Sequence, residues 1–199
     1  MELRPFRAWR GTPRFKERRP GLWIDRQVFE ANGKPAVLPL LVGLVRLGDA
    51  AGVDLPEGGA APDAVSRRVG ALVAAKADEE PCLLATRAPV AVSLTTTRSP
   101  DFTAVPPLSG VRHDFFRIND YAQHVELQGL VKNAEALLLA GRELWEAAKQ
   151  FSVSPAAAKL PGAKFKLCAI ADERVLKETG LRPEALAGAL AFSFEDPVY

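Results

Sequence analysis

The stretch LWIDRQVFEANGKPAVL, residues 22–38, decides the fold class of this chain. Its first ten residues include Trp, Ile, Val and Phe, which favour strands. The dipeptide Asn32-Gly33 that follows is typical of a two-residue type I′ turn. The stretch therefore predicts an antiparallel hairpin, with one strand over 22–31 and a return strand that begins near Ala36. Pro35 has no backbone N–H, which favours a late start or an edge position for the return strand.

After the hairpin, the spacing of apolar residues changes to that of a helix. An apolar residue recurs every three or four positions, at Leu40, Leu44, Leu47 and Ala51. Pro39 suits the first turn of a helix and Gly52 suits its end, so we expect a helix over 39–52. A second helix is expected over 63–78, because Asp63 can cap its N-terminus and apolar residues follow on one side.

The middle of the chain predicts two strands and then one long helix. The strands are expected over 82–86 and 90–97, and a proline-rich loop follows over 99–112. From about Asn119 to Phe151, apolar positions alternate at spacings of four and three: Leu130, Ala134, Leu137, Gly141, Leu144, Ala148 and Phe151. We interpret this pattern as one helix packed on the core, and alternatively as a helix that pairs two subunits of a homo-oligomer.

Short elements are expected in the C-terminal region. Residues 164–170 alternate lysines with apolar residues, which predicts a half-exposed strand. Two short helices are expected over 172–179 and 183–189, and a last strand over 191–194. Together, the patterns predict an α+β fold, in which one long helix and several short helices pack on a small, mainly antiparallel sheet.

Charge divides the chain into an extended basic arm over 1–21 and a single domain over 22–199. Residues 1–26 carry eight basic and three acidic side chains, a net charge of +5, whereas the other 173 residues carry 18 basic and 21 acidic side chains, a net charge of −3. The loop LPEGGAAP at 55–62 is the best candidate for a boundary within the domain. A basic arm on a mildly acidic body favours an anionic partner.

We expect the arm to bind nucleic acid, because its arginines alternate with aromatic residues. Guanidinium groups bind phosphates, and aromatic rings stack on unpaired bases. The residues assigned to this role are Arg4, Arg7, Trp9, Arg10, Arg14, Lys16, Arg18, Arg19 and Trp23. The protein is then a non-enzymatic subunit of a larger complex, with DNA or RNA and other protein subunits as partners. The alternative is a structural assembly protein, such as a virion or particle component, whose arm binds a neighbouring protein subunit.

The sequence LWEAAKQFSVSPAAAKL, residues 144–160, is similar in a generic way to a helix-turn-helix unit. Ala148 is the small residue of the first helix, and Pro155 can begin the second. Pro161 limits that second helix to about six residues, which is shorter than a recognition helix needs. We therefore interpret this stretch as the end of a helix followed by a turn.

Catalytic and cofactor motifs are absent from the sequence. It contains no phosphate-binding GxxxxGK[ST], no GxGxxG and no GxSxG. His113 and His124 are eleven residues apart, whereas two histidine ligands on one helix face are four apart. Cys82 and Cys168 form no CxxC pair and are expected to be buried thiols. We therefore expect no enzymatic activity, cofactor or metal.

No signal peptide and no apolar stretch of about 20 residues is found. This predicts a protein that does not contact a membrane and that is cytoplasmic or part of a macromolecular particle.

Overall fold

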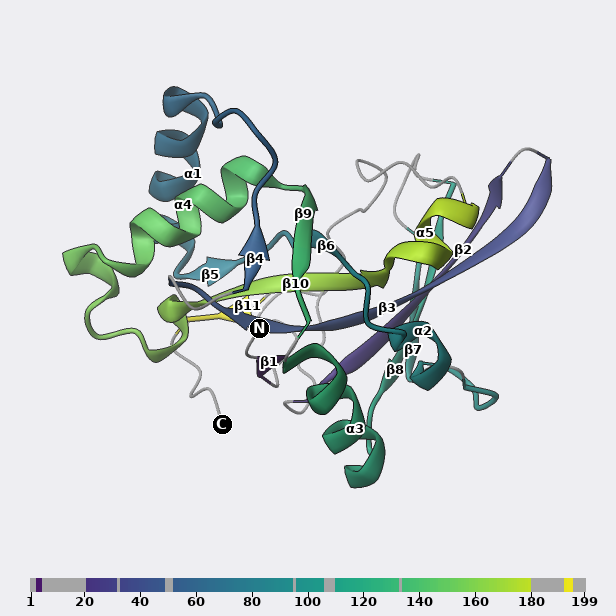
Figure 1. Ribbon diagram of the computed structural model, residues 1–199. Coiled ribbons are helices and arrows are strands. Elements are labelled where there is room, and N and C mark those ends of the chain that lie inside the picture. Colours follow the sequence, from purple (N-terminus) through teal and green to yellow (C-terminus); the bar gives the residue numbers. More distant parts are fainter. Residues whose placement is uncertain are drawn as a thin grey trace.

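A computed structural model of the chain describes residues 3–4, 21–31, 33–48, 52–94, 96–105, 110–132, 134–179 and 192–194. In this part, a nine-stranded sheet forms the centre of the molecule (Figure 1). Along the sheet the strands follow the order β4 (Val53–Asp54), β9 (Ala136–Ala140), β6 (Cys82–Thr86), β10 (Phe165–Asp172), β3 (Lys34–Arg46), β2 (Trp23–Ala31), β8 (Arg112–Arg117) and β7 (Phe102–Ala104). The ninth strand, β1 (Leu3–Arg4), pairs with the end of β3. A separate pair joins β5 (Ala77–Asp78) to β11 (Phe192–Ser193).

The predicted α+β class is confirmed, whereas the predicted small sheet is wrong. Pairings β6–β10 and β4–β9 are parallel, and the other six pairings within the sheet are antiparallel, so the sheet is mixed. The expected hairpin is present, since β2 pairs with β3 over its full length and Gly33 adopts a φ of 73° in the turn. That value lies in the left-handed region, which glycine adopts without steric cost.

Residues 39–46 belong to a strand, so the helix predicted over 39–52 is wrong there. Leu38, Leu40, Leu41, Val42, Leu44 and Val45 are all 0–1% exposed, because β3 lies between β2 and β10 and is covered on both faces. A strand buried on both faces needs apolar residues at every position, and such a run also contains apolar residues at helical spacing. The opposite error occurs at α2 (Val90–Ser93), a short helix where a strand over 90–97 was predicted.

The long helix predicted over 119–151 is also wrong, because a strand interrupts it. The segment contains α3 (Tyr121–Lys132), then β9, then α4 (Arg142–Ser152). Leu138 is 1% exposed within β9, where pairing with β6 provides hydrogen-bond partners for backbone N–H and C=O groups. Gly141 has a φ of 86° and separates β9 from α4. A Cβ atom at this position would lie 3.1 Å from the sulfur of Cys82, so the strand and the helix meet where a side chain has little room.

Several short elements agree with the sequence. Confirmed are the strand 82–86 as β6, the helix 172–179 as α5 (Glu173–Thr179) and the last strand as β11. The helix predicted over 63–78 is present as α1 (Pro62–Ala75), but Ala61 and not Asp63 is its N-cap, and residues 77–78 form β5. The helix expected over 183–189 lies outside the described residues. Strand β10 was predicted, but not its burial: Lys166 is 1% exposed. Two 3-10 helices, η1 (Pro155–Ala157) and η2 (Pro161–Lys164), link α4 to β10.

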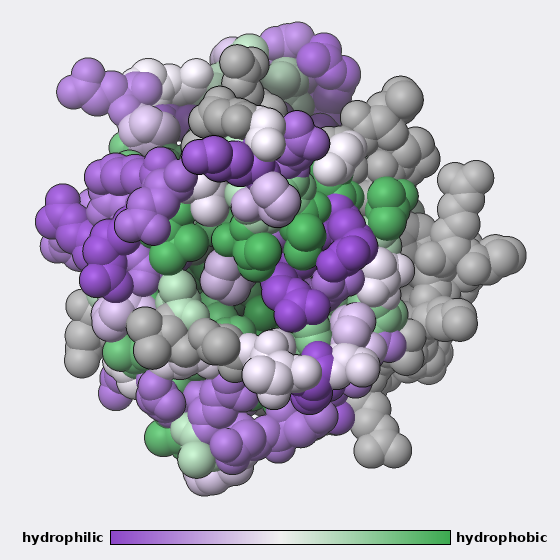
Figure 2. Space-filling view, turned by 90° about the vertical axis from the view of Figure 1, so that its right-hand side faces the viewer, coloured by the Kyte–Doolittle hydropathy of each residue, from purple (hydrophilic) through white to green (hydrophobic). Residues whose placement is uncertain are grey.

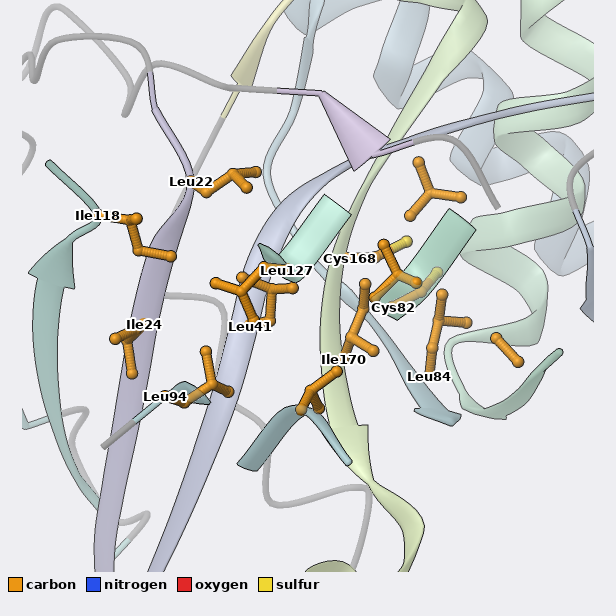
Figure 3. Close-up of a cluster of buried hydrophobic side chains, with 14 of the residues drawn as sticks. Leu22, Ile24, Leu41, Cys82, Leu84, Leu94, Ile118, Leu127, Cys168 and Ile170 are labelled. Atoms are coloured by element: carbon orange, nitrogen blue, oxygen red, sulfur yellow. The ribbon is translucent and has the colours of Figure 1, made fainter. Parts of the chain in front are cut away.

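Helices cover both faces of the sheet and enclose two hydrophobic clusters. On one face, Leu94, which follows α2, and Leu127 of α3 pack with Leu41, Ile170 and their neighbours, and these side chains point toward one another (Figure 3). On the other face, Leu72 of α1 and Leu176 of α5 pack near Leu40 and Ala169. Helix α4 contributes Trp145 to the first cluster and Phe151 to the second. Within the described residues, no helix has the length and apolar character needed to cross a membrane.

Candidate nucleic-acid interface

Both ends of the basic N-terminal segment lie on the same strand. Leu3 pairs with Val45 and Arg4 pairs with Leu44, both on β3. When the chain returns as β2, Trp23 pairs with Val42, two residues further along β3. Residues 5–20, which lie outside the described residues, therefore connect two neighbouring points of one strand. The predicted arm is attached to the sheet at both of its ends.

Residues 5–20 carry six basic side chains and one acidic side chain, a net charge of +5. Exposed Arg46 and Lys164 lie close to the anchor, at the end of β3 where the Leu47 N–H donates to the Lys164 carbonyl at 2.8 Å. These two described cations lie at the end of the β3–β10 pair where the segment is anchored.

The structure places two of the nine predicted nucleic-acid-binding residues. Arg4 belongs to β1, where its backbone pairs with Leu44. Arg7, Trp9, Arg10, Arg14, Lys16, Arg18 and Arg19 lie outside the described residues. The assignment of Trp23 to nucleic-acid binding is wrong, because its side chain is only 2% exposed and packs edge-on against Phe102, with 5.6 Å between ring centroids. An indole buried in this way cannot stack on a base.

The described part of the domain adds an arginine cluster, formed by Arg26 of β2, Arg112 of β8 and Arg98 of the segment before β7. Arg26 and Arg112 each donate a 3.1 Å hydrogen bond to the same oxygen of Asp114. Arg98 binds Asp101 at 2.9 Å. Sequence reasoning missed this cluster because its members are far apart in the chain. The one available signal was Arg26, which we counted with the basic segment.

The helix-turn-helix similarity does not extend to a recognition helix. Helix α4 ends at Ser152 as expected, but the element that follows is η1, a 3-10 helix of three residues. A single 3-10 turn is too short to lie along a DNA groove.

His113 lies in β8 and is 1% exposed. Its Nδ1 atom is 2.9 Å from Asp25, a partner that the sequence did not suggest, and Gln27 also donates to Asp25 at 3.1 Å. Within the part of the chain that is described, His113 Nε2 and Gln27 Oε1 are buried and have no hydrogen-bond partner. If Nδ1 carries the proton, both atoms are acceptors, so they fit a hydrogen-bond donor such as a buried water.

The two cysteines are free and buried, as expected. Cys168 lies opposite Cys82 in the parallel pair β10–β6. Burial, the largest influence, raises the pKa of the Cys82 thiol to about 12, despite the opposing charge of Lys166. A thiol with such a pKa is protonated at neutral pH and is a poor nucleophile or metal ligand. In the described ranges, no group of three His, Cys, Asp or Glu side chains is placed to bind a metal ion.

A groove of about 420 Å³ lies between β9 and α5. Figure 2 shows the side of the molecule on which α5 and the β2–β3 hairpin lie in Figure 1. Hydrophobic residues surround a hollow on this side, and hydrophilic residues surround the hydrophobic ones. The groove is lined by Leu137, Leu139, Leu176, Ala85, Ala136, Asp54, Glu135, Glu173, Arg87 and Lys177. Three of these side chains are acidic and two are basic, so the groove does not favour a phosphate over a neutral ligand.

Comparisons of the chain with protein-family models, with curated proteins and with solved structures gave no significant match.

Proposed function

We propose that the protein binds nucleic acid, DNA or RNA, through the basic segment formed by residues 4–19, as a non-enzymatic subunit of a larger complex. The observation that carries this proposal is a net charge of +5 on residues 5–20, a segment whose two ends lie side by side on β3. Each cation that neutralises a phosphate releases a condensed counterion, and this release drives binding.

Attachment at both ends supports the proposal further. The described anchors, Arg4 on β1 and Trp23 on β2, place both ends of the segment beside the exposed Arg46 and Lys164. Trp9 is the aromatic residue of the segment that we assign to base stacking, because Trp23 belongs to the core.

The test is a salt titration of binding to a single-stranded DNA oligonucleotide and to an RNA of the same sequence. For single strands the logarithm of the binding constant falls with a slope of roughly −0.7 per phosphate contact. We expect Arg7→Gln, Arg10→Gln and Arg14→Gln together to reduce the steepness of this slope by up to about 2.

A matched control removes the same charge elsewhere on the surface. Arg67, Lys149 and Lys159 are exposed on α1, on α4 and after η1. Their replacement by Gln is expected to leave the slope unchanged. Equal slopes for both triple variants, or no binding by the unmodified protein at low salt, would overturn the proposal. A protein that instead binds only other protein subunits would fit the assembly role given as the alternative above.

A further inference from the structure

An aromatic ring and two carboxylates hold three guanidinium groups together on the outer part of the β2–β8 pair. Arg26 lies opposite Asp114 in the β2–β8 register, and Arg112 lies opposite Val28. The guanidinium of Arg26 is 4.7 Å from the ring centroid of Phe116, and that of Arg98 is 5.4 Å from the same centroid. The Phe116 side chain is fully buried, so the ring is a fixed support for both cations.

The two carboxylates of the cluster are already engaged by several donors. One oxygen of Asp114 accepts hydrogen bonds from Arg26 and Arg112, and the other accepts one from Thr103 at 2.9 Å. Asp101 accepts from the guanidinium of Arg98 at 2.9 Å and from the backbone N–H of Arg117 at 2.7 Å. Three arginines face two aspartates, so the cluster keeps a net charge of +1.

Among the described residues, most guanidinium N–H groups of the cluster have no acceptor. Arg26 and Arg112 each donate one hydrogen bond to a described residue, and Arg98 donates one to Asp101 and one to the Arg117 carbonyl, out of the five N–H groups of each guanidinium. The side chains of Arg26, Arg98 and Arg112 are 31%, 42% and 52% exposed, respectively. Guanidinium groups that are pre-positioned in this way lose little freedom when they bind an oxyanion.

The register of β3 gives the position of the cluster relative to the anchor of the basic segment. Arg4 lies opposite Leu44 of β3, and Arg26 lies opposite Pro39 of the same strand, roughly 17 Å away. Directly opposed residues of an antiparallel pair share a face, so Arg26 lies on the face of Leu41, and position 4 lies on the opposite face with Leu44. The cluster is therefore a contact region separate from the anchor of the segment.

We propose that Arg26, Arg98 and Arg112 bind the phosphate backbone of the nucleic acid that the basic segment contacts. This inference rests on the proposed function and adds a second contact region on the folded domain. The cluster holds no exposed aromatic ring and no base-reading amide, so its contacts are with phosphate and do not depend on the base sequence.

The test compares single-stranded oligothymidylate binding by Arg112→Gln and by the triple variant Arg26→Gln, Arg98→Gln and Arg112→Gln. Arg67→Gln is the control, because Arg67 is exposed on α1 and pairs with Asp63 at 2.8 Å. We expect the triple variant to reduce the steepness of the salt slope by about 2 and Arg112→Gln to reduce it by about 0.7, with no change in the control. An oligonucleotide of mixed sequence should show the same losses.

The result separates the two proposals. If the cluster variants keep the affinity and slope of the unmodified protein while the Arg7, Arg10 and Arg14 substitutions reduce them, the cluster proposal is wrong and the segment proposal holds. If the unmodified protein shows no binding, both are wrong. Arg112 is the most exposed member and Asp114 keeps Arg26 and Thr103 as partners in its absence, so Arg112→Gln decides the question if the triple variant fails to fold.

Discussion

The Nζ atom of Lys166 lies 2.7 Å from both carboxylate oxygens of Asp78, and both side chains are almost completely buried. Lys166 also donates to the Glu80 carbonyl, and Asp78 accepts the backbone N–H of Leu167 at 2.9 Å. Burial is the largest influence and lowers the pKa of Lys166, but the charge and hydrogen bond of Asp78, together with the neighbouring Cys82 and Cys168, raise this pKa above its ordinary value. The pair therefore attaches the short strand β5 to β10 through charge-assisted hydrogen bonds.

Lys166→Met should reduce the free energy of unfolding by about 3–5 kcal/mol, because it leaves the buried carboxylate of Asp78 without its counter-ion. Urea unfolding followed by circular dichroism measures the change. Lys177→Met is the control, since Lys177 is a mostly exposed partner of Glu173 on α5 and should have little effect. The double variant Lys166→Met with Asp78→Leu should recover part of the loss. A Lys166→Met protein as stable as the original would contradict the structural role of the pair.

Stability should fall in acid partly because of Asp114. Burial alone would raise the pKa of this carboxyl, but hydrogen bonds from Arg26, Thr103 and Arg112 lower it below the ordinary value of 3.8. A pKa that is lower in the folded chain than in the unfolded chain stabilises the fold above about pH 4, and this stability is lost as the pH falls through the folded value. Asp114→Asn should therefore lose less stability than the original protein between about pH 6 and about pH 2. Parallel acid dependences of the two proteins would show that Asp114 is not involved.

Cys82 and Cys168 should resist alkylation in the folded protein. The pKa of Cys82 is raised to about 12 and that of Cys168 is also raised, in both cases mainly by burial. Iodoacetamide at about pH 8 should label neither thiol until urea unfolds the chain. Val153→Cys gives an internal control, because the side chain of Val153 is 84% exposed and a thiol there should react at once. Rapid labelling of Cys82 in the absence of urea would contradict its placement in the core.

Two adjacent leucines of β9 should respond differently to truncation. Leu138 is 1% exposed, whereas Leu137 is 44% exposed on the opposite face of the strand. Leu138→Ala should cost about 2–5 kcal/mol of unfolding free energy, and Leu137→Ala should cost less than about 1 kcal/mol. A helix over this region, with Leu137 on its apolar side, predicts a large cost at Leu137. Urea unfolding of the two variants distinguishes the strand from the helix.

The sequence was most informative where structure depends on neighbouring residues. The hairpin of β2 and β3 was predictable because Asn32-Gly33 specifies a turn locally. Helix α5 was also predicted, as a short helix over 172–179. Strand β3 was predicted incorrectly beyond Pro39, because its burial on both faces depends on β10, which lies more than 100 residues away. The strand in the middle of the predicted long helix is a similar case, since β6 and β4 provide its partners.

In the candidate site, too, the feature that depends on neighbouring residues was predicted and the one that depends on long-range contacts was not. The basic segment was visible as a charge asymmetry, which requires only counting. The arginine cluster was not visible, because Arg26, Arg98 and Arg112 come together only through the pairing of β2 with β8. Lys166 was expected to face solvent because lysines alternate with apolar residues in β10, and only the position of β5 shows that its charge is neutralised in the core.

The anchoring of residues 5–20 on neighbouring points of β3 has a consequence for how this chain can change during evolution or by engineering. For a flexible connection between two fixed points, each doubling of its length costs only about 0.6 kcal/mol in closure entropy. The fixed points here are the strand pairs of β1 and β2 with β3. We therefore expect that a foreign peptide of similar length, such as an epitope or a different binding sequence, can replace the arginine-rich one.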